Sequence, residues 1–207
     1  MSGRRGGGRP RLPRGVIDLG SDDWSPPDAV VLDTSAVVEF LLPSQRAHAH
    51  WRLFFRACAG NGTSLVFNRL VETELYDALF NIALRERWGK GAVHGPKRYD
   101  GRIRARAARL LDVYREEWQE LLDTSDTVVI EVGEVAGQVP ELMRQCGMRS
   151  HDAVHAATAI LTETSLIATT DSGFATLPED VLQIVTDPNR VPHMRRRRAQ
   201  WASRRRN

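Results

Sequence analysis

Short apolar runs, each followed by a segment with helical spacing, constrain the fold of this chain more than any other feature. The runs cover residues 29–32, 64–67, 128–130, 166–169 and 182–185. An uninterrupted apolar run of this length is typical of a strand covered on both faces, as in a parallel sheet. Strands that alternate with helices indicate an α/β fold with right-handed crossovers. We therefore predict a three-layer α/β/α domain around a central, mainly parallel sheet of four or five strands.

The segments between the runs carry apolar residues at intervals of three and four, which predicts helices. A helix should begin at Ala36, and a second should carry Trp51, Phe54 and Phe55. Asn68 is a suitable N-cap for a helix that continues to about Trp88. Further helices are expected over residues 101–122, around 135–145, and from Ser150 onward.

At 207 residues, the chain is long enough for one substantial core. We expect a domain over residues 28–187, with a basic insert at about 85–109. Residues 1–27, rich in Arg, Gly and Pro, show no apolar period and are predicted to be a disordered tail. Residues 188–207 are predicted to be an Arg-rich C-terminal tail.

The net charge of +3 conceals an uneven distribution along the chain. Residues 1–14 contain five Arg and residues 195–207 contain seven, with no acid in either segment, which leaves 17 basic and 26 acidic residues between them. The central domain is therefore acidic and both ends are cationic. Such ends can bind phosphate chains, or they can act as solubilising segments that dock on the acidic body.

No apolar run approaches the roughly 20 residues that a membrane-spanning helix requires, and the N-terminus lacks the apolar stretch of a secretory signal. Cys58 and Cys146 show no Cys-x-x-Cys or Cys/His spacing, so the sequence gives no support for a zinc site. Two reduced thiols fit a cytoplasmic protein, and that is the expected compartment.

Four acids stand at the ends of predicted elements, where a parallel sheet places its ligands. Asp33 and Asp171 follow strands, Asp152 opens a helix, and Glu74 lies in the second turn of another. Each has an ordinary alternative role, as a turn residue, an N-cap or a solvated helix acid. The case for a site depends on their joint placement, because their wide spacing lets them meet only through the fold.

The residues around these acids resemble the PIN-domain nucleases, and within that family the VapC-type toxins of bacterial toxin–antitoxin pairs. The resemblance covers about residues 28–187 and is carried by residues 30–36, 70–75, 151–157 and 168–174. It implies an acidic site made of Asp33, Glu74, Asp152 and Asp171. It also implies supporting contacts from the hydroxyls of Ser35, Thr169 and Thr170.

In the family pattern the helix acid directly precedes a Leu, which favours Glu74 over Glu72, and Asp77 one turn later is a possible additional acid. The resemblance further implies an RNA substrate, products with 5′-phosphate and 3′-hydroxyl ends, a cognate antitoxin protein and a homodimer. Clustered carboxylates repel one another unless a cation neutralises them. Oxygen ligands select hard ions, so Mg²⁺ is the expected cofactor and Mn²⁺ an alternative.

A basic segment between Arg85 and Arg109 offers cationic surface for RNA, which an acidic body needs in order to hold a phosphate chain. The candidate RNA-binding residues are Arg98, Arg102, Arg104 and Arg106. The alternative is a solvated helical face. We expect His155, one turn after Asp152, to be a packing or hydrogen-bonding residue rather than a catalytic base.

Two other functions remain open. A phosphohydrolase with Asp33 as nucleophile would resemble the haloacid dehalogenases, but these carry a second Asp two residues later, where this chain has Ser35. A PIN-like module that binds RNA or protein without cleaving it is the other alternative, and the intact acidic set argues against it.

Overall fold

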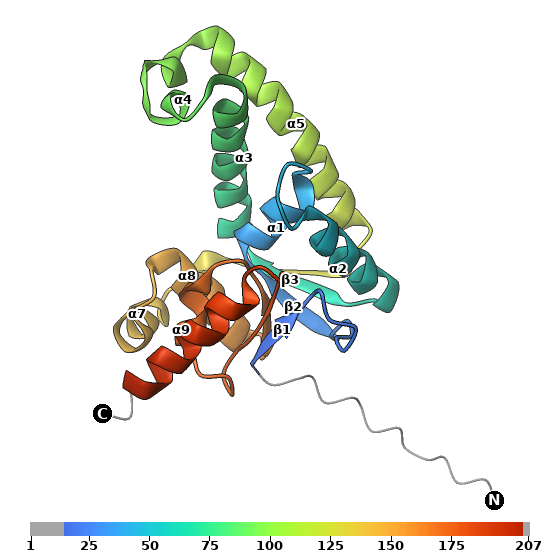
Figure 1. Cartoon of the computed structure of the whole chain (residues 1–207), viewed down its shortest axis with the longest axis vertical. Coiled ribbons are helices and arrows are strands. Elements are labelled where there is room, and N and C mark those ends of the chain that lie inside the picture. Colours follow the sequence, from blue (N-terminus) through green and yellow to red (C-terminus); the bar gives the residue numbers. More distant parts are fainter. Residues whose placement is uncertain (1–14, 205–207) are drawn as a thin grey trace, which may run out of the picture.

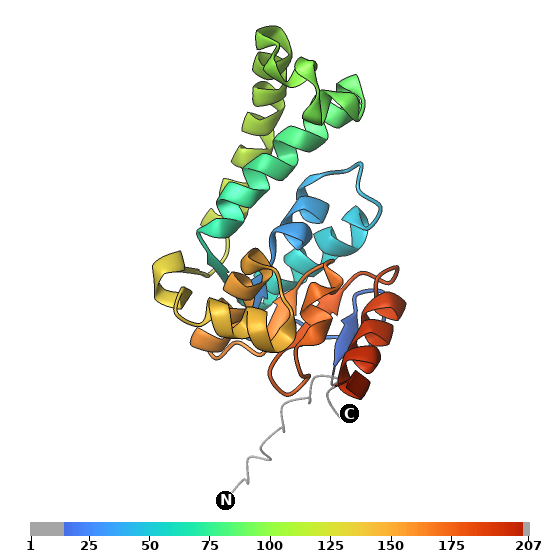
Figure 2. The same ribbon diagram turned by 90° about the vertical axis from the view of Figure 1, so that its left-hand side faces the viewer.

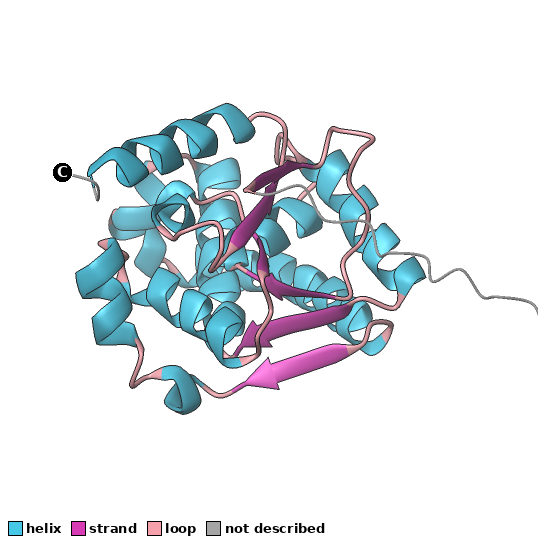
Figure 3. Ribbon diagram, turned by 90° about the horizontal axis from the view of Figure 1, so that it is seen from below, coloured by secondary structure: helices cyan, strands magenta, loops and turns pink. Residues whose placement is uncertain are grey.

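The computed structural model describes residues 15–204, in which a six-stranded sheet lies between two layers of helices (Figure 3). The strands are β1 (Val16–Asp18), β2 (Ala29–Leu32), β3 (Ser64–Asn68), β4 (Thr127–Ile130), β5 (Leu166–Ala168) and β6 (Gln183–Thr186). All neighbouring strands pair in parallel, in the order β1-β6-β5-β2-β3-β4. The predicted three-layer α/β/α architecture is confirmed, and the five predicted strands lie within one or two residues of their expected positions.

The sixth strand lies where the sequence predicts a disordered tail. β1 pairs with β6, Val16 opposite Ile184, and both Val16 and Ile17 are buried. Trp24 packs on the ring of Phe54 at 5.6 Å between centroids. The prediction that order begins near Asp28 is therefore wrong for residues 15–27, while residues 1–14 lie outside the described part. A three-residue strand is too short to show a period, and its stability comes from a partner strand far along the chain.

The helices are α1 (Thr34–Leu41), α2 (His48–Asn61), α3 (Leu70–Trp88), α4 (Gly91–His94), α5 (Gly101–Asp123), α6 (Val132–Val135), α7 (Val139–Cys146), α8 (Ser150–Leu161) and α9 (Val191–Arg204), with short 3₁₀ helices η1 (Pro96–Tyr99) and η2 (Ser172–Thr176). The predicted helices occur in the expected order, whereas α4 and α9 were not predicted. No helix among residues 15–204 is long and apolar enough to cross a bilayer.

Alternating strand residues face two separate cores, as the twofold period of a strand requires. Val30 and Leu32 face α1, α2, α3 and α5, where Trp51 and Trp118 are almost fully buried. Val31, between them, faces α6 to α9, where α8 contributes mainly alanines. Small side chains on α8 allow its backbone to approach the sheet closely, and this brings its N-terminal turn to the edge where β2 and β5 end.

Helices α3 and α5 extend beyond the body as a long arm, with α4 and η1 at its tip (Figures 1 and 2). The arm has a small core of its own. It consists of Ala83, Leu84, Ala92 and Ala107, with Phe80, Trp88, Val93 and Ile103 packed against it. The predicted basic insert is this tip and the first turns of α5.

The predicted C-terminal tail also contains ordered structure, and the expectation of a tail from residue 188 is wrong for most of its length. α9 packs against β1 and η2 on the body (Figure 1). Its Val191 and Met194 are buried in the core on the α8 side. Two apolar residues among so many arginines gave too weak a period to predict a packed helix.

The strand order contains a switch point between β2 and β5. From β2 the chain proceeds outward through β3 to β4, and it then returns to place β5 on the other side of β2. In open parallel sheets, ligands bind outside the carboxyl ends of the strands at such a point. The residues that follow β2 and β5 are therefore the first candidates for a functional site.

Candidate active site

The four acids singled out in the sequence line one cleft of about 910 Å³ at this switch point. Asp33 directly follows β2, and Asp171 follows β5 as the N-cap of η2. Asp152 lies in the first turn of α8, and Glu74 on α3. Four separate elements thus deliver carboxylates to the walls of a single cleft.

Asp33 is buried and held by two hydroxyl groups. Ser35 Oγ donates to Asp33 Oδ2 at 2.5 Å, and Thr169 Oγ1 donates to the same oxygen at 2.7 Å. Hydrogen bonds to a carboxylate oxygen are strong and fix the orientation of the carboxylate. The supporting role expected for Ser35 and Thr169 is therefore matched by direct contacts.

The same hydroxyls connect the loops after β2 and β5. Ser35 Oγ accepts from the backbone N of Thr170 at 2.9 Å, and Thr169 Oγ1 accepts from the backbone N of Asp171 at 2.9 Å. Thr170 takes part through its main chain, whereas its hydroxyl was the expected contact. These bonds set the position of Asp171 relative to Asp33.

Glu74 is held by three side chains. Thr34 Oγ1 donates to Glu74 Oε2 at 2.7 Å, His155 Nε2 lies 3.1 Å from the same oxygen, and His151 Nδ1 lies 2.6 Å from Oε1. Partial burial raises the pKa of Glu74, but the hydrogen bonds that this carboxylate accepts from His155 and Thr34 outweigh burial and leave the pKa below its ordinary value. Glu74 is therefore ionised at neutral pH.

His155 is fully buried beneath the cleft, and its other ring nitrogen is oriented by Asn68. The backbone N of Leu70 donates to Asn68 Oδ1 at 3.0 Å, which directs the amide Nδ2 toward His155 Nδ1 at 2.9 Å and Thr158 Oγ1 at 3.0 Å. Burial lowers the pKa of His155, but the carboxylates of Glu74 and Asp33 outweigh burial and raise this pKa, which favours the protonated ring. The Asn68 donor opposes protonation. A proton on Nδ1 would face the Asn68 donor, so these bonds fit the neutral ring with its hydrogen on Nε2.

His155 Nε2 also lies 3.7 Å from Asp33 Oδ1. One buried ring nitrogen is therefore within 4 Å of two of the four acids. The expectation that His155 is a packing or hydrogen-bonding residue agrees with this position, since its ring supports Glu74 from below.

Asp152 and Asp171 meet at Gly173. A Cβ on Gly173 would lie 3.0 Å from Asp152 Oδ2 and 3.2 Å from Asp171 Oδ1, so both carboxylates occupy the space beside this glycine. Burial raises the pKa of Asp152 to about 6, with further contributions from the negative charges of Asp171 and Asp33. A cation placed here would relieve this repulsion.

No group of three or more His, Cys, Asp or Glu side chains in residues 15–204 is arranged to hold a metal ion. Asp33 and Glu74 are instead turned toward hydroxyl and imidazole partners, whereas Asp152 and Asp171 flank the space beside Gly173. The donor set still fits Mg²⁺ in kind, because this ion prefers oxygen ligands and is usually held by one or two carboxylates with water and phosphate oxygens.

The neighbouring acids of α3 differ in position. Glu72 pairs with Arg69 at 3.1 Å and does not line the cleft, whereas Asp77 does line it. Asp77 receives a hydrogen bond from Asn81 at 2.9 Å and lies 3.6 Å from an Arg98 nitrogen.

Arg98 itself joins the arm tip to α3. It also donates to Asn81 and to the backbone oxygen of Val93, and it lies over the ring of Phe80. Of the four arginines considered for RNA, Arg98 is thus committed to contacts within the arm. Arg102, Arg104 and Arg106 are exposed on α5.

These observations agree with a family comparison. The model of the PIN domain family matches residues 30–180, which is more than half of the chain. The chain belongs to the PIN domain family. A search of curated proteins found no match.

Membership in the PIN domain family places the chain in a superfamily whose members are typically nucleases. The matched region includes all four acids and both loops at the switch point, while β1, β6 and α9 lie outside it. The resemblance seen in the sequence is therefore confirmed at the level of the family.

Several residues of this PIN domain site escaped the sequence analysis. Thr34 contacts Glu74 directly, and Asn68 was assigned only as an N-cap. His151 was noted beside Asp152, but its contact with Glu74 was not predicted. A polar residue at the end of an apolar strand was the available signal for Asn68. Nothing local could indicate Thr34, whose partner lies 40 residues away.

Proposed function

We propose that this PIN domain is a metal-dependent ribonuclease that hydrolyses phosphodiester bonds in RNA. The observation that carries the proposal is that four carboxylates from four elements line one cleft at the switch point of the sheet. Such a concentration of negative charge would repel a phosphate group. A site of this kind therefore suits phosphodiester chemistry only with a cation present.

Asp152 and Asp171, with Asp33 nearby, would hold Mg²⁺ or Mn²⁺. A bound divalent ion would stabilise the negative charge that builds up on the phosphate during hydrolysis. Neighbouring hydroxyl and imidazole side chains hold two of the acids in position. Ser35 and Thr169 hold the carboxylate of Asp33 in place through hydrogen bonds, and His155 and Thr34 do the same for Glu74.

RNA is the proposed substrate because the arm carries exposed cations, whereas the chain between its two basic ends is acidic overall. Arg102, Arg104 and Arg106 are exposed on the first turns of α5, and no carboxylate in residues 15–204 lies within ion-pair distance of them. Exposed guanidinium groups without carboxylate partners are available to phosphates.

We further propose that the protein is the toxin of a toxin–antitoxin pair, active on cytoplasmic RNA as a homodimer and inhibited by a cognate antitoxin that covers the cleft. Family membership supports this reading. Expression of the intact protein should slow growth, and expression of Asp33→Asn should not. Equal toxicity of the two forms would contradict the toxin assignment.

The central test is incubation of purified protein with end-labelled RNA and Mg²⁺ or Mn²⁺. Asp33→Asn and Asp152→Asn should abolish cleavage, and Asp112→Asn, which removes an exposed acid on α5 outside the cleft, should leave it unchanged. Calorimetric titration with Mn²⁺ alone should show binding that Asp152→Asn weakens.

Cleavage that needs no metal, or that persists in both cleft variants, would remove the proposed mechanism. If RNA binds but remains intact under every condition, the chain is a non-cleaving RNA-binding module. If phosphomonoesters are hydrolysed while RNA is not, Asp33 acts as the nucleophile of a phosphohydrolase.

A further inference from the structure

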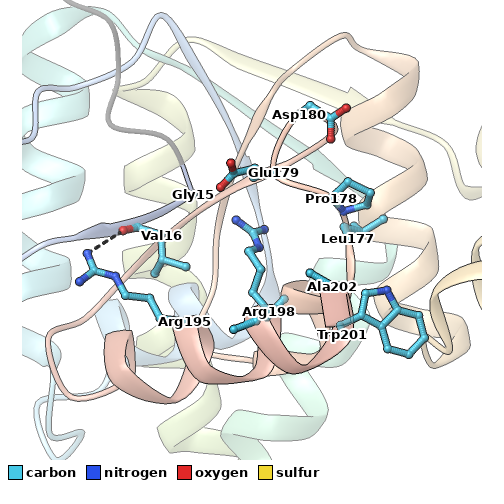
Figure 4. A pocket seen from close by; sticks show the side chains of 12 residues that line it. Gly15, Val16, Leu177, Pro178, Glu179, Asp180, Arg195, Arg198, Trp201 and Ala202 are labelled. Carbon is cyan, nitrogen blue, oxygen red and sulfur yellow. Dashed lines mark hydrogen bonds between the residues drawn. The ribbon is translucent and has the colours of Figure 1, made fainter. Parts of the chain in front are cut away.

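The C-terminal helix α9 presents two faces that differ in charge and in contacts. It contains four consecutive arginines, Arg195 to Arg198, which helical geometry distributes around the axis. On the face toward the sheet, Arg195 donates to the backbone oxygen of Val16 at 3.3 Å (Figure 4). Arg198, on the same face, donates to the backbone oxygen of Leu182 at 2.9 Å. These two arginines hold α9 against the body.

The opposite face of α9 forms a basic groove. His193, Arg197, Gln200 and Arg204 follow one another at intervals of four, three and four residues, which places them in one stripe. With Arg196 they line a groove of about 460 Å³ whose far wall comes from the end of α7 and from η2. None of the residues that line this groove is acidic. The guanidinium groups of Arg196, Arg197 and Arg204 therefore give the groove a positive charge that no lining acid offsets.

The basic groove adjoins the acidic cleft through η2. Arg197 Nη1 donates to Ser172 Oγ at 3.1 Å, and His193 Nε2 lies 3.2 Å from the same oxygen. Ser172 directly follows Asp171, and the next residue, Gly173, donates its backbone N to Asp171 Oδ1 at 2.7 Å. One short 3₁₀ helix therefore separates the cations of α9 from the acids of the cleft.

The cavity on the inner face of α9 has a different character. It measures about 720 Å³ and is lined largely by apolar side chains such as Leu177 and Trp201 (Figure 4). Glu179 and Asp180 stand at its rim. Carboxylates beside Arg198 would compete with a phosphate, so only the outer, basic groove suits a polyanion.

We propose that the basic groove binds the phosphate backbone of the RNA strand whose scissile bond lies in the acidic cleft. The proposal rests on the ribonuclease function for its account of the neighbouring cleft. The stripe from His193 to Arg204 extends about 16 Å along the helix axis, long enough to contact more than one phosphate. The acids of the cleft repel the phosphates of RNA, and the arginines beside the cleft attract them. This attraction directs the RNA strand along α9.

The test compares two double variants that lose the same charge. Arg196→Gln with Arg197→Gln neutralises the groove. Arg56→Gln with Arg115→Gln neutralises two exposed arginines of α2 and α5, which belong to the opposite helical layer. Binding of a single-stranded RNA by the full chain is measured in EDTA between about 50 and about 200 mM salt.

Each lost phosphate contact reduces the slope of log Kd against log salt by about 0.7 for single strands, so the groove variant should lose about 1.4. The control variant should keep the slope of the unmodified protein. Arg196 and Arg197 are exposed, so the thermal unfolding midpoint should stay the same in both variants. Should the groove variant unfold early, Arg197→Glu alone replaces it, and a reduced slope is again expected.

Equal slopes in the groove and control variants would overturn the proposal. The proposal would also be overturned if the groove variant bound RNA as tightly as the unmodified protein but no longer bound an acidic protein. The groove would then be a protein interface. Failure of the ribonuclease function gives a separate result. In that case the intact protein binds RNA with the groove-dependent slope but does not cleave it with Mg²⁺ or Mn²⁺.

Discussion

The raised pKa of Asp152 predicts that this acid destabilises the metal-free protein at neutral pH. The protonated form is favoured in the folded state, so its contribution to stability is complete below the ordinary pKa of 3.8 and is lost as pH rises through about 6. Replacement by Asn removes the ionisation. Asp152→Asn should therefore be more stable than the unmodified protein near neutrality, with little difference at low pH.

The magnitude follows from the two pKa values. The interval from 3.8 to about 6 corresponds to about 3 kcal/mol if the full effect is retained. Asp152 is only partly buried, and solvent screening reduces this to about 1 kcal/mol. For a domain of this size, that change moves the thermal midpoint by about 2–4 °C.

The assay is urea unfolding in EDTA at several values between about pH 4 and about pH 8. The difference in the free energy of unfolding between Asp152→Asn and the unmodified protein should grow with pH and level off above about pH 7. Asp112→Asn provides the control for loss of an exposed acid. A difference that stays constant across the pH range would refute the reasoning, because neither burial nor the charges of Asp171 and Asp33 would then raise the pKa of Asp152.

Three other substitutions test the supports of the site and the core. Asn68→Ala leaves His155 Nδ1 without its buried donor and should lower the free energy of unfolding by about 2 kcal/mol in urea titrations; no loss would show that water replaces the amide. Gly173→Ala places a Cβ 3.0 Å from Asp152 Oδ2, and the resulting displacement should reduce the rate of RNA cleavage by about tenfold or more with a small effect on stability. Trp118→Ala removes a ring packed on Phe67 and should cost about 3–5 kcal/mol; a cost below about 1 kcal/mol would contradict its core role.

The local sequence determined most of the elements of the fold. Continuous apolar runs identified β2 to β6, and helical spacing identified the long helices. Their alternation fixed the α/β class. These predictions succeeded because burial on both faces of a parallel strand, or on one stripe of a helix, leaves a pattern within a few neighbouring residues. β1 and α9 have no such pattern of sufficient length, and their positions follow from contacts with β6 and with the core on the α8 side.

For the site, the sequence identified candidate acids at the ends of predicted elements. The family resemblance grouped four of these acids into one site. Asp33, Glu74, Asp152 and Asp171 all line the cleft, but their partners had to be found in three dimensions. The pairing of β2 with β5 brings Thr169 to Asp33, and the packing of α8 brings His155 to Glu74. No sequence pattern records these distances.

The roles of the arginines divide in the same way. The sequence determined that the C-terminal segment and the basic insert are cationic. Only the tertiary structure decided that Arg98 and Arg198 make contacts within the protein while Arg196 and Arg197 line a groove beside the acids. The physical reason is that charge is a property of the residue itself, whereas its availability to a ligand depends on which face of a helix packs against the rest of the chain.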